Sequence, residues 1–385
     1  MADVNNSRPI LATIHLDALR RNLARVKTAT ALAGDAKVWV VVKANAYGHG
    51  VRHIFEGLRG ADGFACLDLT EGQALRSMGW RGPILLLEGA FNPRDLELCS
   101  RLNLWHVIHC EAQIDWLAAH KTNEPQRVFL KLNSGMNRLG FKPAQYRAAY
   151  ARLAMLPQVA EVSHLTHYSD ADSDAVQGKV AVARQWEVFQ TATQDLDGEC
   201  SLGNSAATLR TAKLSGDWVR AGVALYGAAP DYPAKTSADW GLQPAMTLSS
   251  RIVSVQDLTV GDSIGYGSAF IADQPMRIGT VACGYADGYP RSAGNAQGGA
   301  PVLVDGQRTR TLGRISMDML AVDLTHLPNS GFGSGVTLWG RADPLQADSA
   351  VLTIDEVAAA AGTISYELMC AVAPRVPFAV NEGEG

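Results

Sequence analysis

A lysine that directly follows a run of apolar residues is the first candidate for chemistry in this sequence. Lys43 comes after the apolar run at residues 38–42 and before a turn of small and glycine residues at 44–50. Small residues let a backbone approach a ligand, and burial lowers the pKa of a lysine so that its amine becomes nucleophilic. A neutral amine can form a Schiff base with an aldehyde cofactor. A lysine at the end of a strand is, however, commonly a surface residue, so this motif alone leaves both interpretations open.

Two short turns of small residues are candidates for binding a phosphate group. One contains Gly222 and Val223, just after Arg220, and the other contains Asn204 and Ser205. Backbone N–H groups in such turns, and a hydroxyl at the start of a helix, can bind an anion. Asn204 and Ser205 in isolation fit a plain helix N-cap equally well. The two turns nevertheless follow the seventh and eighth predicted strands, where barrel enzymes frequently bind phosphate.

A third candidate is the segment at residues 129–140, which carries Lys131 and Arg138 on a loop that contains glycine. Apolar residues between and beside these cations argue against a fully exposed loop. His167 ends another apolar run, where a histidine is more often structural than catalytic. His164 with His167, and His106 with His109, are too weakly patterned to be metal ligands, so no metal site is expected.

All of these candidates follow predicted strands, and the strands must therefore bring them together. Between residues 38 and 225, eight short apolar runs alternate with segments of helical periodicity. Such alternation indicates parallel strands joined by crossover helices. Eight units are enough to close a (β/α)8 TIM-type barrel, whereas a doubly wound sheet usually has five or six strands. An α/β barrel places its active site at the carboxyl ends of the strands, which is where the candidates lie.

The predicted elements of this barrel are short and regularly spaced. The strands are expected at residues 38–42, 63–67, 84–87, 106–109, 128–132, 161–166, 200–203 and 218–221. The helices are expected at residues 51–59, 70–78, 95–102, 111–119, 145–155, 175–196 and 205–212.

The texture of the sequence changes after about residue 243, where short strand-like runs are separated by Gly, Pro and Asp turns. One helix is expected at 353–361, with a capping sequence at its start. We therefore expect a barrel domain at residues 1–240 and a mainly β domain at 241–385, linked at about 230–241. Roughly the first 12 residues could join the β domain instead. The β strands are expected at residues 248–258, 277–282, 301–304, 309–312, 319–323 and 335–338.

Composition excludes several classes of protein. The chain has 385 residues with 34 basic and 38 acidic side chains, and its net charge of −4 offers no general attraction to nucleic acid. Its longest apolar runs are too short to span a membrane, and its start does not resemble a signal peptide. Six scattered cysteines without a C-x-x-C pair fit reduced thiols in the cytoplasm.

Taken together, these motifs resemble those of the alanine racemases, a family of pyridoxal-phosphate enzymes with a barrel domain, a β domain and a dimeric active site. The resemblance covers residues 10–377 and is strongest around Lys43. It implies a cytoplasmic homodimer that interconverts L-alanine and D-alanine, either for cell-wall peptidoglycan or for alanine catabolism. The other matching segments are Asn204-Ser205-Ala206, Gly265-Tyr266-Gly267, Gly284-Tyr285-Ala286-Asp287-Gly288, Gly313-Arg314-Ile315-Ser316-Met317-Asp318 and Ile364-Ser365-Tyr366-Glu367.

The resemblance also implies a role for each matching residue. Lys43 holds pyridoxal 5'-phosphate as an internal aldimine, and Lys43 and Tyr266 are the two bases, with Tyr266 supplied by the other subunit. Arg138 binds the phenolic oxygen of the cofactor and the substrate carboxylate, which the main chain of Met317 also binds. The remaining cofactor-binding residues surround the phosphate and the ring: Tyr47, Asn204, Ser205, Gly222, Val223 and Tyr366 at the phosphate, and His167 and Arg220 at the ring.

The sequence departs from the family pattern at a few positions. Asn133-Ser134 replaces a common Asp-Thr pair near Lys131, a lysine that is carbamylated in several relatives. Ser316 stands where many members have cysteine, and Ser201 stands where some have histidine. None of these changes removes a catalytic group.

Arg220 separates the racemase interpretation from its main alternative. A barrel-type pyridoxal-phosphate decarboxylase of ornithine or diaminopimelate is expected to have an acidic residue at this position and a cysteine acid from the partner. A guanidinium stays protonated and cannot give a proton to the pyridine nitrogen, which weakens the ring as an electron sink. A non-catalytic pyridoxal-phosphate carrier is a third alternative, but such proteins resemble the barrel alone.

Overall fold

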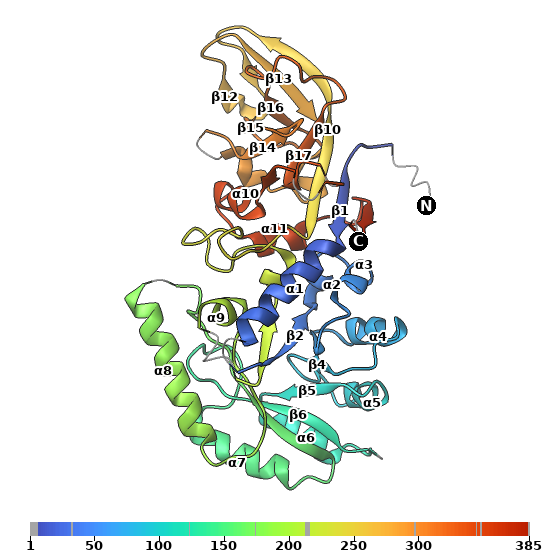
Figure 1. Cartoon of the computed structure of the whole chain (residues 1–385), viewed down its shortest axis with the longest axis vertical. Coiled ribbons are helices and arrows are strands. Elements are labelled where there is room, and N and C mark those ends of the chain that lie inside the picture. The colour runs from blue at the N-terminus through green and yellow to red at the C-terminus, as the bar shows by residue number, and fades with distance from the viewer. Residues whose placement is uncertain are drawn as a thin grey trace.

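Eight parallel strands close into a barrel that forms the lower part of the molecule in Figure 1. The computed structural model describes residues 7–31, 34–122, 124–173, 175–211, 216–295, 298–343, 345–346 and 349–383. The predicted TIM-type barrel is confirmed. Its strands, in order around the barrel, are β2 (Lys37–Val41), β3 (Gly63–Cys66), β4 (Ile84–Leu86), β5 (Trp105–Ile108), β6 (Gln126–Lys131), β7 (Val159–Leu165), β8 (Cys200–Ser201) and β9 (Trp218–Ala221).

Helices follow the barrel strands, and each predicted strand limit is correct to within two residues. The predicted helix at 51–59 is divided into α3 (Val51–Ile54) and the 3-10 helix η1 (Glu56–Leu58), and the predicted end of another at residue 212 lies outside the described residues. The remaining helices of this region are α1 (Leu16–Ala31), α2 (Lys43–Tyr47), α4 (Leu69–Ser77), α5 (Asp95–Arg101), α6 (Glu111–Ala119), α7 (Pro143–Ala154), α8 (Val176–Thr193), α9 (Ser205–Arg210) and η3 (Val223–Tyr226).

The second region is a nine-stranded sheet built around one long strand, β10 (Met246–Leu258). β10 pairs with β17 as well as with β13, so that six strands form a closed ring in the order β10, β13, β16, β15, β14 and β17. The prediction that this region is mainly β is confirmed. Besides β10 and two strands from the ends of the chain, the sheet contains β13 (Met276–Val281), β14 (Pro301–Val304), β15 (Gln307–Leu312), β16 (Leu320–Asp323), β17 (Gly335–Arg341) and β18 (Val351–Leu352). A separate two-stranded sheet consists of β11 (Ser263–Ile264) and β12 (Phe270–Ile271).

Both ends of the chain reach this sheet. β1 (Leu11–His15) pairs antiparallel with β10 and parallel with β19 (Phe378–Asn381), so strands more than 230 residues apart lie side by side (Figure 1). Two helices then connect the sheet to the barrel: α10 (Ile354–Ala360) and α11 (Ser365–Ala371). Thr353 caps α10 by accepting a hydrogen bond from the Glu356 N–H, as the capping sequence predicts. The remaining short helices are η4 (Tyr266–Ser268), η5 (Tyr285–Asp287) and η6 (Arg291–Asn295).

The interior of the barrel is filled with aromatic rings at the amino end of its strands. Trp39 on β2 stacks on Trp218 of β9 at 4.0 Å between ring centroids, and meets Trp105 of β5 edge-on at 5.5 Å. The ring centroid of Phe129 on β6 lies 6.3 Å from that of Trp39. Gly63 makes room for this cluster, because a Cβ there would lie 2.3 Å from the Trp39 ring. We call Trp39, Trp105, Phe129 and Trp218 the aromatic floor.

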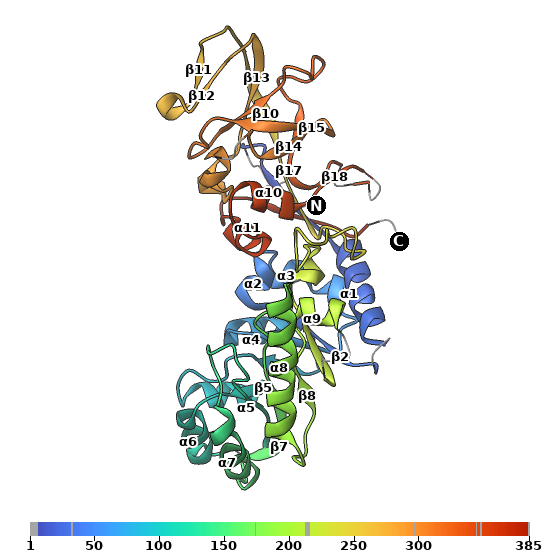
Figure 2. The same ribbon diagram turned by 90° about the vertical axis from the view of Figure 1, so that its left-hand side faces the viewer.

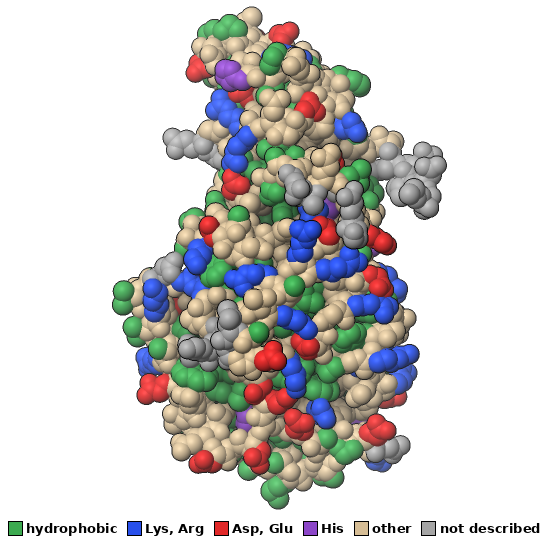
Figure 3. Space-filling model, viewed as in Figure 1, with side chains coloured by type: hydrophobic (Ala, Val, Ile, Leu, Met, Phe, Trp, Pro, Cys, Tyr) green, Lys and Arg blue, Asp and Glu red, His purple; other side chains and the backbone are tan. Residues whose placement is uncertain are grey.

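The surface of the barrel carries interspersed basic and acidic side chains on the face shown in Figure 3. Within the described residues, no helix is both long and apolar enough to cross a membrane.

Candidate active site

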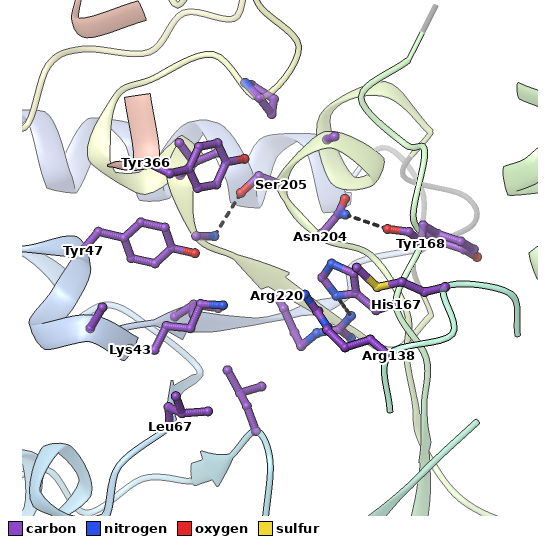
Figure 4. A pocket seen from close by; sticks show the side chains of 18 of the residues that line it. Lys43, Tyr47, Leu67, Arg138, His167, Tyr168, Asn204, Ser205, Arg220 and Tyr366 are labelled. Atoms are coloured by element: carbon purple, nitrogen blue, oxygen red, sulfur yellow. Dashed lines mark hydrogen bonds between the residues drawn. The ribbon is translucent and has the colours of Figure 1, made fainter. Parts of the chain in front are cut away.

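A cavity of about 480 Å³ opens at the carboxyl ends of the barrel strands (Figure 4). This volume is typical of a site for a small ligand. The cavity gathers side chains from loops that follow different strands, and α11 adds residues from the other side. Eleven of the residues singled out from the sequence line it: Lys43, Tyr47, Lys131, Arg138, His167, Asn204, Ser205, Arg220, Gly222, Val223 and Tyr366.

The turn that carries Lys43 has a left-handed backbone. Four consecutive residues, 44–47, have φ angles of 55°, 51°, 57° and 51°. This conformation costs about 1–2 kcal/mol for each residue with a Cβ. Local hydrogen bonds offset part of that cost: the Val51 N–H donates to Oδ1 of Asn45 at 3.0 Å, and the Asn45 N–H donates to Glu71 at 2.9 Å. Strain of this kind collects at functional sites, and here the strained residues directly follow Lys43, which lines the cavity.

One side of the cavity is built from hydroxyl groups and a glycine. The Gly222 N–H donates to Oγ of Ser205 at 2.9 Å. A Cβ on Gly222 would lie 2.4 Å from the hydroxyl oxygen of Tyr47, so only glycine leaves room for that hydroxyl. The Tyr366 hydroxyl, from α11, points into the same space as those of Tyr47 and Ser205 (Figure 4). Three hydroxyls lie beside the backbone of Gly222, which has no side chain to fill the space. Such an arrangement suits the oxygens of a small anion.

Arg220 is buried and held in place by its neighbours. Its guanidinium donates to the carbonyl oxygens of Ser201 and Thr166, both at 2.7 Å, and to Oγ of Ser201 at 2.9 Å. It also donates to Nδ1 of His167 at 3.2 Å. Burial lowers the pKa of Arg220 to about 10. At neutral pH the group is therefore a fixed cation at the base of the cavity.

Positive charge dominates the cavity, whose lining includes four Lys and Arg side chains and two carboxylates. Burial, and then Arg138, lower the pKa of Lys43. Burial, and then Arg220 and Arg138, lower the pKa of Lys131 to about 8. The pKa of His167 also falls well below its usual value, because the ring is buried and faces these cations. A bound anion would relieve this crowding of like charges.

The loop between Lys131 and Arg138 carries the departure noted from the sequence. Oδ1 of Asn133 accepts hydrogen bonds from the N–H groups of Gly135 at 3.2 Å and Asn137 at 3.1 Å. Asn133 therefore shapes the turn that leads to Arg138.

Sequence reasoning missed five polar residues of the lining: Glu88, Tyr168, Ser169, Asp172 and Cys370. Glu88 follows β4, so the rule that located Lys43 could have found it. Cys370 lies four residues after Tyr366 on α11, and residues with this spacing share one helical face. Asp172 lies in an irregular loop, where no periodic pattern indicates its place.

Tyr266 and Met317 are the two expected site residues that do not line this cavity. Tyr266 lies on η4 and is 68% exposed, and Met317 is 53% exposed. Figure 2 shows the neighbouring β11 and β12 at the end of the sheet farthest from the barrel. Within one chain, the described residues therefore give a cavity without these two groups.

Family models and known proteins agree on what this chain is similar to. The model described as "Alanine racemase, N-terminal domain" matches residues 14–230, and that described as "Alanine racemase, C-terminal domain" matches residues 245–380. The alanine racemase of Delftia acidovorans is 66% identical over 372 residues, which cover 96% of this chain and 98% of that protein. The crystal structure of the biosynthetic alanine racemase from Pseudomonas aeruginosa is 44% identical, with a TM-score of 0.89, over 97% of this chain and 99% of that chain. A structure from Bartonella henselae that contains covalently bound pyridoxal phosphate is 23% identical, has a TM-score of 0.82, covers 97% of this chain and 99% of its own, and shares the fold.

Proposed function

This chain belongs to the alanine racemase family and is a pyridoxal-phosphate-dependent isomerase that interconverts L-alanine and D-alanine, and we propose that the barrel cavity is its active site. The observation that carries this proposal is the meeting of Lys43, a surplus of cations and a ring of hydroxyls in one cavity of about 480 Å³. Lys43 holds the cofactor in that site.

The residues of the cavity fit the charge and shape of pyridoxal phosphate. Its phosphate suits the space beside Gly222, which a Cβ would fill, together with the hydroxyls of Tyr47, Ser205 and Tyr366. The neighbouring Asn204 and Val223 complete that wall. With the cofactor bound, His167 would lie against the ring, Arg220 would face the ring nitrogen, and Arg138 would bind the phenolic oxygen. The lowered pKa of Lys43 favours the neutral amine that binds an aldehyde.

Two bases on opposite faces of the substrate carry out the racemisation. Pyridoxal phosphate, when bound, withdraws electrons from the substrate Cα and so makes its proton acidic. In the direction from D-alanine to L-alanine, Lys43 would remove the Cα proton on one face, and a proton would be delivered to the Cα on the opposite face. Tyr266 of the partner subunit would deliver that proton, and in the reverse direction Tyr266 would remove the proton of L-alanine while Lys43 delivers one. Arg138 and the main chain at Met317 hold the substrate carboxylate, which fixes the orientation of the Cα.

Arg220 favours racemisation over the competing reactions. Its guanidinium donates to three backbone carbonyls and retains its charge near neutral pH. It therefore cannot protonate the ring nitrogen, and the ring stays a moderate electron sink. A decarboxylase would need a carboxylate at this position, so this side chain argues against that alternative.

The active unit in this proposal is a homodimer with shared sites. Tyr266 is exposed and lies outside its own cavity, and Tyr285, Met317 and Met319 are also exposed. The Tyr285 N–H donates to the carbonyl of Ser316, which joins two of these loops. An exposed group of aromatic and methionine side chains is typical of a protein interface. A second copy of the chain is the occupant that completes both cavities, through an isologous contact.

The shared site can be tested by mixing two inactive variants, Lys43→Ala and Tyr266→Ala. In a mixed dimer with shared sites, one site carries both changes and the other carries neither. Random exchange makes about half the dimers mixed, so activity should recover to about a quarter of the wild-type value. Native mass spectrometry confirms that the subunits exchange. If they exchange and no activity returns, Tyr266 serves its own subunit and the shared site is wrong.

The proposal also includes a domain boundary within the chain and the compartment of the cell in which the protein is found. We place the boundary between the barrel domain and the mainly β domain at about residue 240. All six cysteines are free thiols, which suits a reducing compartment, and we propose a cytoplasmic location. Fractionation of cells that express the chain, with a periplasmic marker enzyme as reference, tests the location.

A further inference from the structure

A small internal cavity lies between the barrel and the sheet, on the far side of the turn that carries Lys43. Its volume is about 10 Å³, which is close to the space that one water molecule needs. The lining includes His49, which lies six residues after Lys43, and Trp339, which lies on β17 of the sheet. Both side chains are buried, and Nε2 of His49 and Nε1 of Trp339 have no hydrogen-bond partner among the described residues.

The hydrogen bonds of His49 determine which of its ring nitrogens carries the proton. Nδ1 lies 3.1 Å from the carbonyl oxygen of Ala46 and 3.0 Å from that of Tyr47. Carbonyl oxygens only accept hydrogen bonds, so Nδ1 must be the protonated nitrogen. Burial lowers the pKa of His49 to about 4, so the ring is neutral in solution near pH 7. Nε2 is consequently an acceptor that needs a donor.

Trp339 has the opposite requirement. The indole Nε1–H is a donor only, and it needs an acceptor. A water molecule in this cavity would satisfy both groups at once, because it can donate to Nε2 of His49 and accept from Nε1 of Trp339. Leaving either group unpaired in the interior costs free energy, and buried waters typically bridge such groups.

We propose that His49 is a positioning residue that couples the turn bearing Lys43 and Tyr47 to the sheet, through Nδ1 on the turn and through a buried water shared with Trp339. The inference rests on the proposed role of Lys43 in holding the cofactor. His49 itself contacts neither the cavity of the active site nor the reacting atoms.

Two further contacts support a coupling at this point. The ring of His49 packs against Tyr226 at 4.5 Å between centroids, and Tyr226 stacks on Tyr47 at 4.8 Å. The turn also meets α11 closely, because a Cβ on Gly48 would lie 2.1 Å from the carbonyl oxygen of Met369. The left-handed residues 44–47 are strained, so a donor that holds two of their carbonyls has a direct effect on where Lys43 lies.

Two substitutions separate the two nitrogens of His49. The side-chain amide of asparagine can reach the position of Nδ1 and that of glutamine the position of Nε2, so His49→Asn keeps the donor to the turn and His49→Gln loses it. Apoenzyme is titrated with pyridoxal phosphate, and binding is followed by absorbance. His49→Gln should weaken binding by about tenfold, whereas His49→Asn should stay within about threefold of the wild type. Equal effects of the two variants on cofactor binding would overturn the positioning role.

Thermal unfolding and a matched pair of variants distinguish positioning from a general loss of stability. His106 is also fully buried, has its pKa lowered to about 4 and has one unpartnered ring nitrogen, but it lies on β5 and not on the turn that follows Lys43. His106→Asn and His106→Gln should lower the unfolding temperature without changing the affinity for pyridoxal phosphate. If they weaken the affinity as much as His49→Gln does, the effect is not specific to the turn.

The water and the tautomer can be observed directly in the wild-type holoenzyme. A high-resolution crystal structure should contain a water within hydrogen-bond distance of both nitrogens, and 15N-histidine spectra should show protonated Nδ1 at His49. An empty cavity, a direct bond between the two rings, or protonated Nε2 would overturn the inference. Borohydride reduction, which should fix the cofactor on Lys43, tests the proposed function separately, because label on another lysine contradicts that proposal whatever His49 does.

Discussion

The two ends of the barrel are built from the same strands and hold opposite kinds of side chain. On β6, Phe129 belongs to the aromatic floor and Lys131, two residues later, lines the active-site cavity. On β9, Trp218 and Arg220 repeat this arrangement. Residues two apart on a strand share one face, so the interior changes from aromatic to cationic over about 7 Å.

The difference teaches where stability and chemistry reside in this molecule. Buried aromatic rings remove a large apolar area from water, and they contribute folding energy. Buried cations are costly, and the lowered pKa values of Lys43, Lys131 and Arg220 express that cost. The floor is therefore expected to govern folding and the cationic end to govern ligand binding and catalysis.

The largest expected effect separates the two ends of a single strand. Lys43→Ala removes the proposed base and cofactor anchor at the carboxyl end of β2, and should lower racemase activity at least about 10³-fold. Lys37→Ala changes the other end of β2, where Lys37 pairs with Glu199 at 2.7 Å, and should leave activity within about twofold. Formation of D-alanine from L-alanine is the measurement. Similar activities for the two variants would contradict the expected difference between the two ends of β2.

Removing a ring from the floor should give the reverse result. Trp39→Ala should lower the free energy of unfolding by about 3–5 kcal/mol, because it opens a cavity in the barrel. Activity per folded molecule should stay within about twofold of the wild type. Urea denaturation measures the stability, and activity is assayed at a temperature where the variant is folded. If Trp39→Ala does not fold, Trp39→Phe is measured in its place. A loss of activity at unchanged stability in either variant would contradict a purely structural role for the aromatic floor.

A buried carboxylate between the barrel and the sheet should give a smaller effect that depends on pH. Asp355 accepts a hydrogen bond from the Ala229 N–H at 2.9 Å, and burial raises the pKa of this carboxyl to about 6. The folded protein therefore binds a proton more tightly than the unfolded chain, whose Asp355 has a pKa of 3.8. This contribution to stability is complete below about pH 4 and is lost as the pH rises through 6, by an amount on the order of 2–3 kcal/mol.

Asp355→Asn removes this titration and keeps an acceptor for the Ala229 N–H. Urea denaturation of both holoenzymes at several values between pH 4 and pH 7 should give curves whose difference changes across this range, in favour of the variant at higher pH. A constant difference would mean that Asp355 is ionised alike in the folded and unfolded states.

The smallest expected effect concerns the cationic end of the barrel, where Gly222 and Tyr47 lie close together. Gly222→Ala places a methyl group 2.4 Å from the Tyr47 hydroxyl, and should weaken binding of pyridoxal phosphate by about tenfold. Tyr47→Phe in the same chain removes the oxygen that the methyl meets, so the double variant should lose less affinity than the sum of the single changes. Gly60→Ala is the control, because a Cβ there makes only an ordinary contact at 3.8 Å. Strict additivity would show that Gly222 and Tyr47 do not meet.

Much of the fold could be predicted because local patterns encode it. The strands and most helices of the barrel were located to within a few residues by runs of apolar residues and by helical periodicity. The helix α1 was missed although its buried positions, among them Leu16, Leu19, Leu23 and Val26, follow helical spacing. The strands β1 and β19 were also missed, because each is short and pairs with a partner that no local pattern identifies.

The sequence by itself determined which residues lie at the carboxyl ends of the barrel strands, since a strand limit depends on a few neighbouring residues. Only the tertiary structure decided how these residues act on one another. Burial and then Arg220 from another strand lower the pKa of Lys131, the close fit of Gly222 requires Tyr47, and Glu88 enters the cavity from a third loop. Charge, burial and steric fit depend on distances between residues far apart in the chain, and those distances exist only once the barrel has closed.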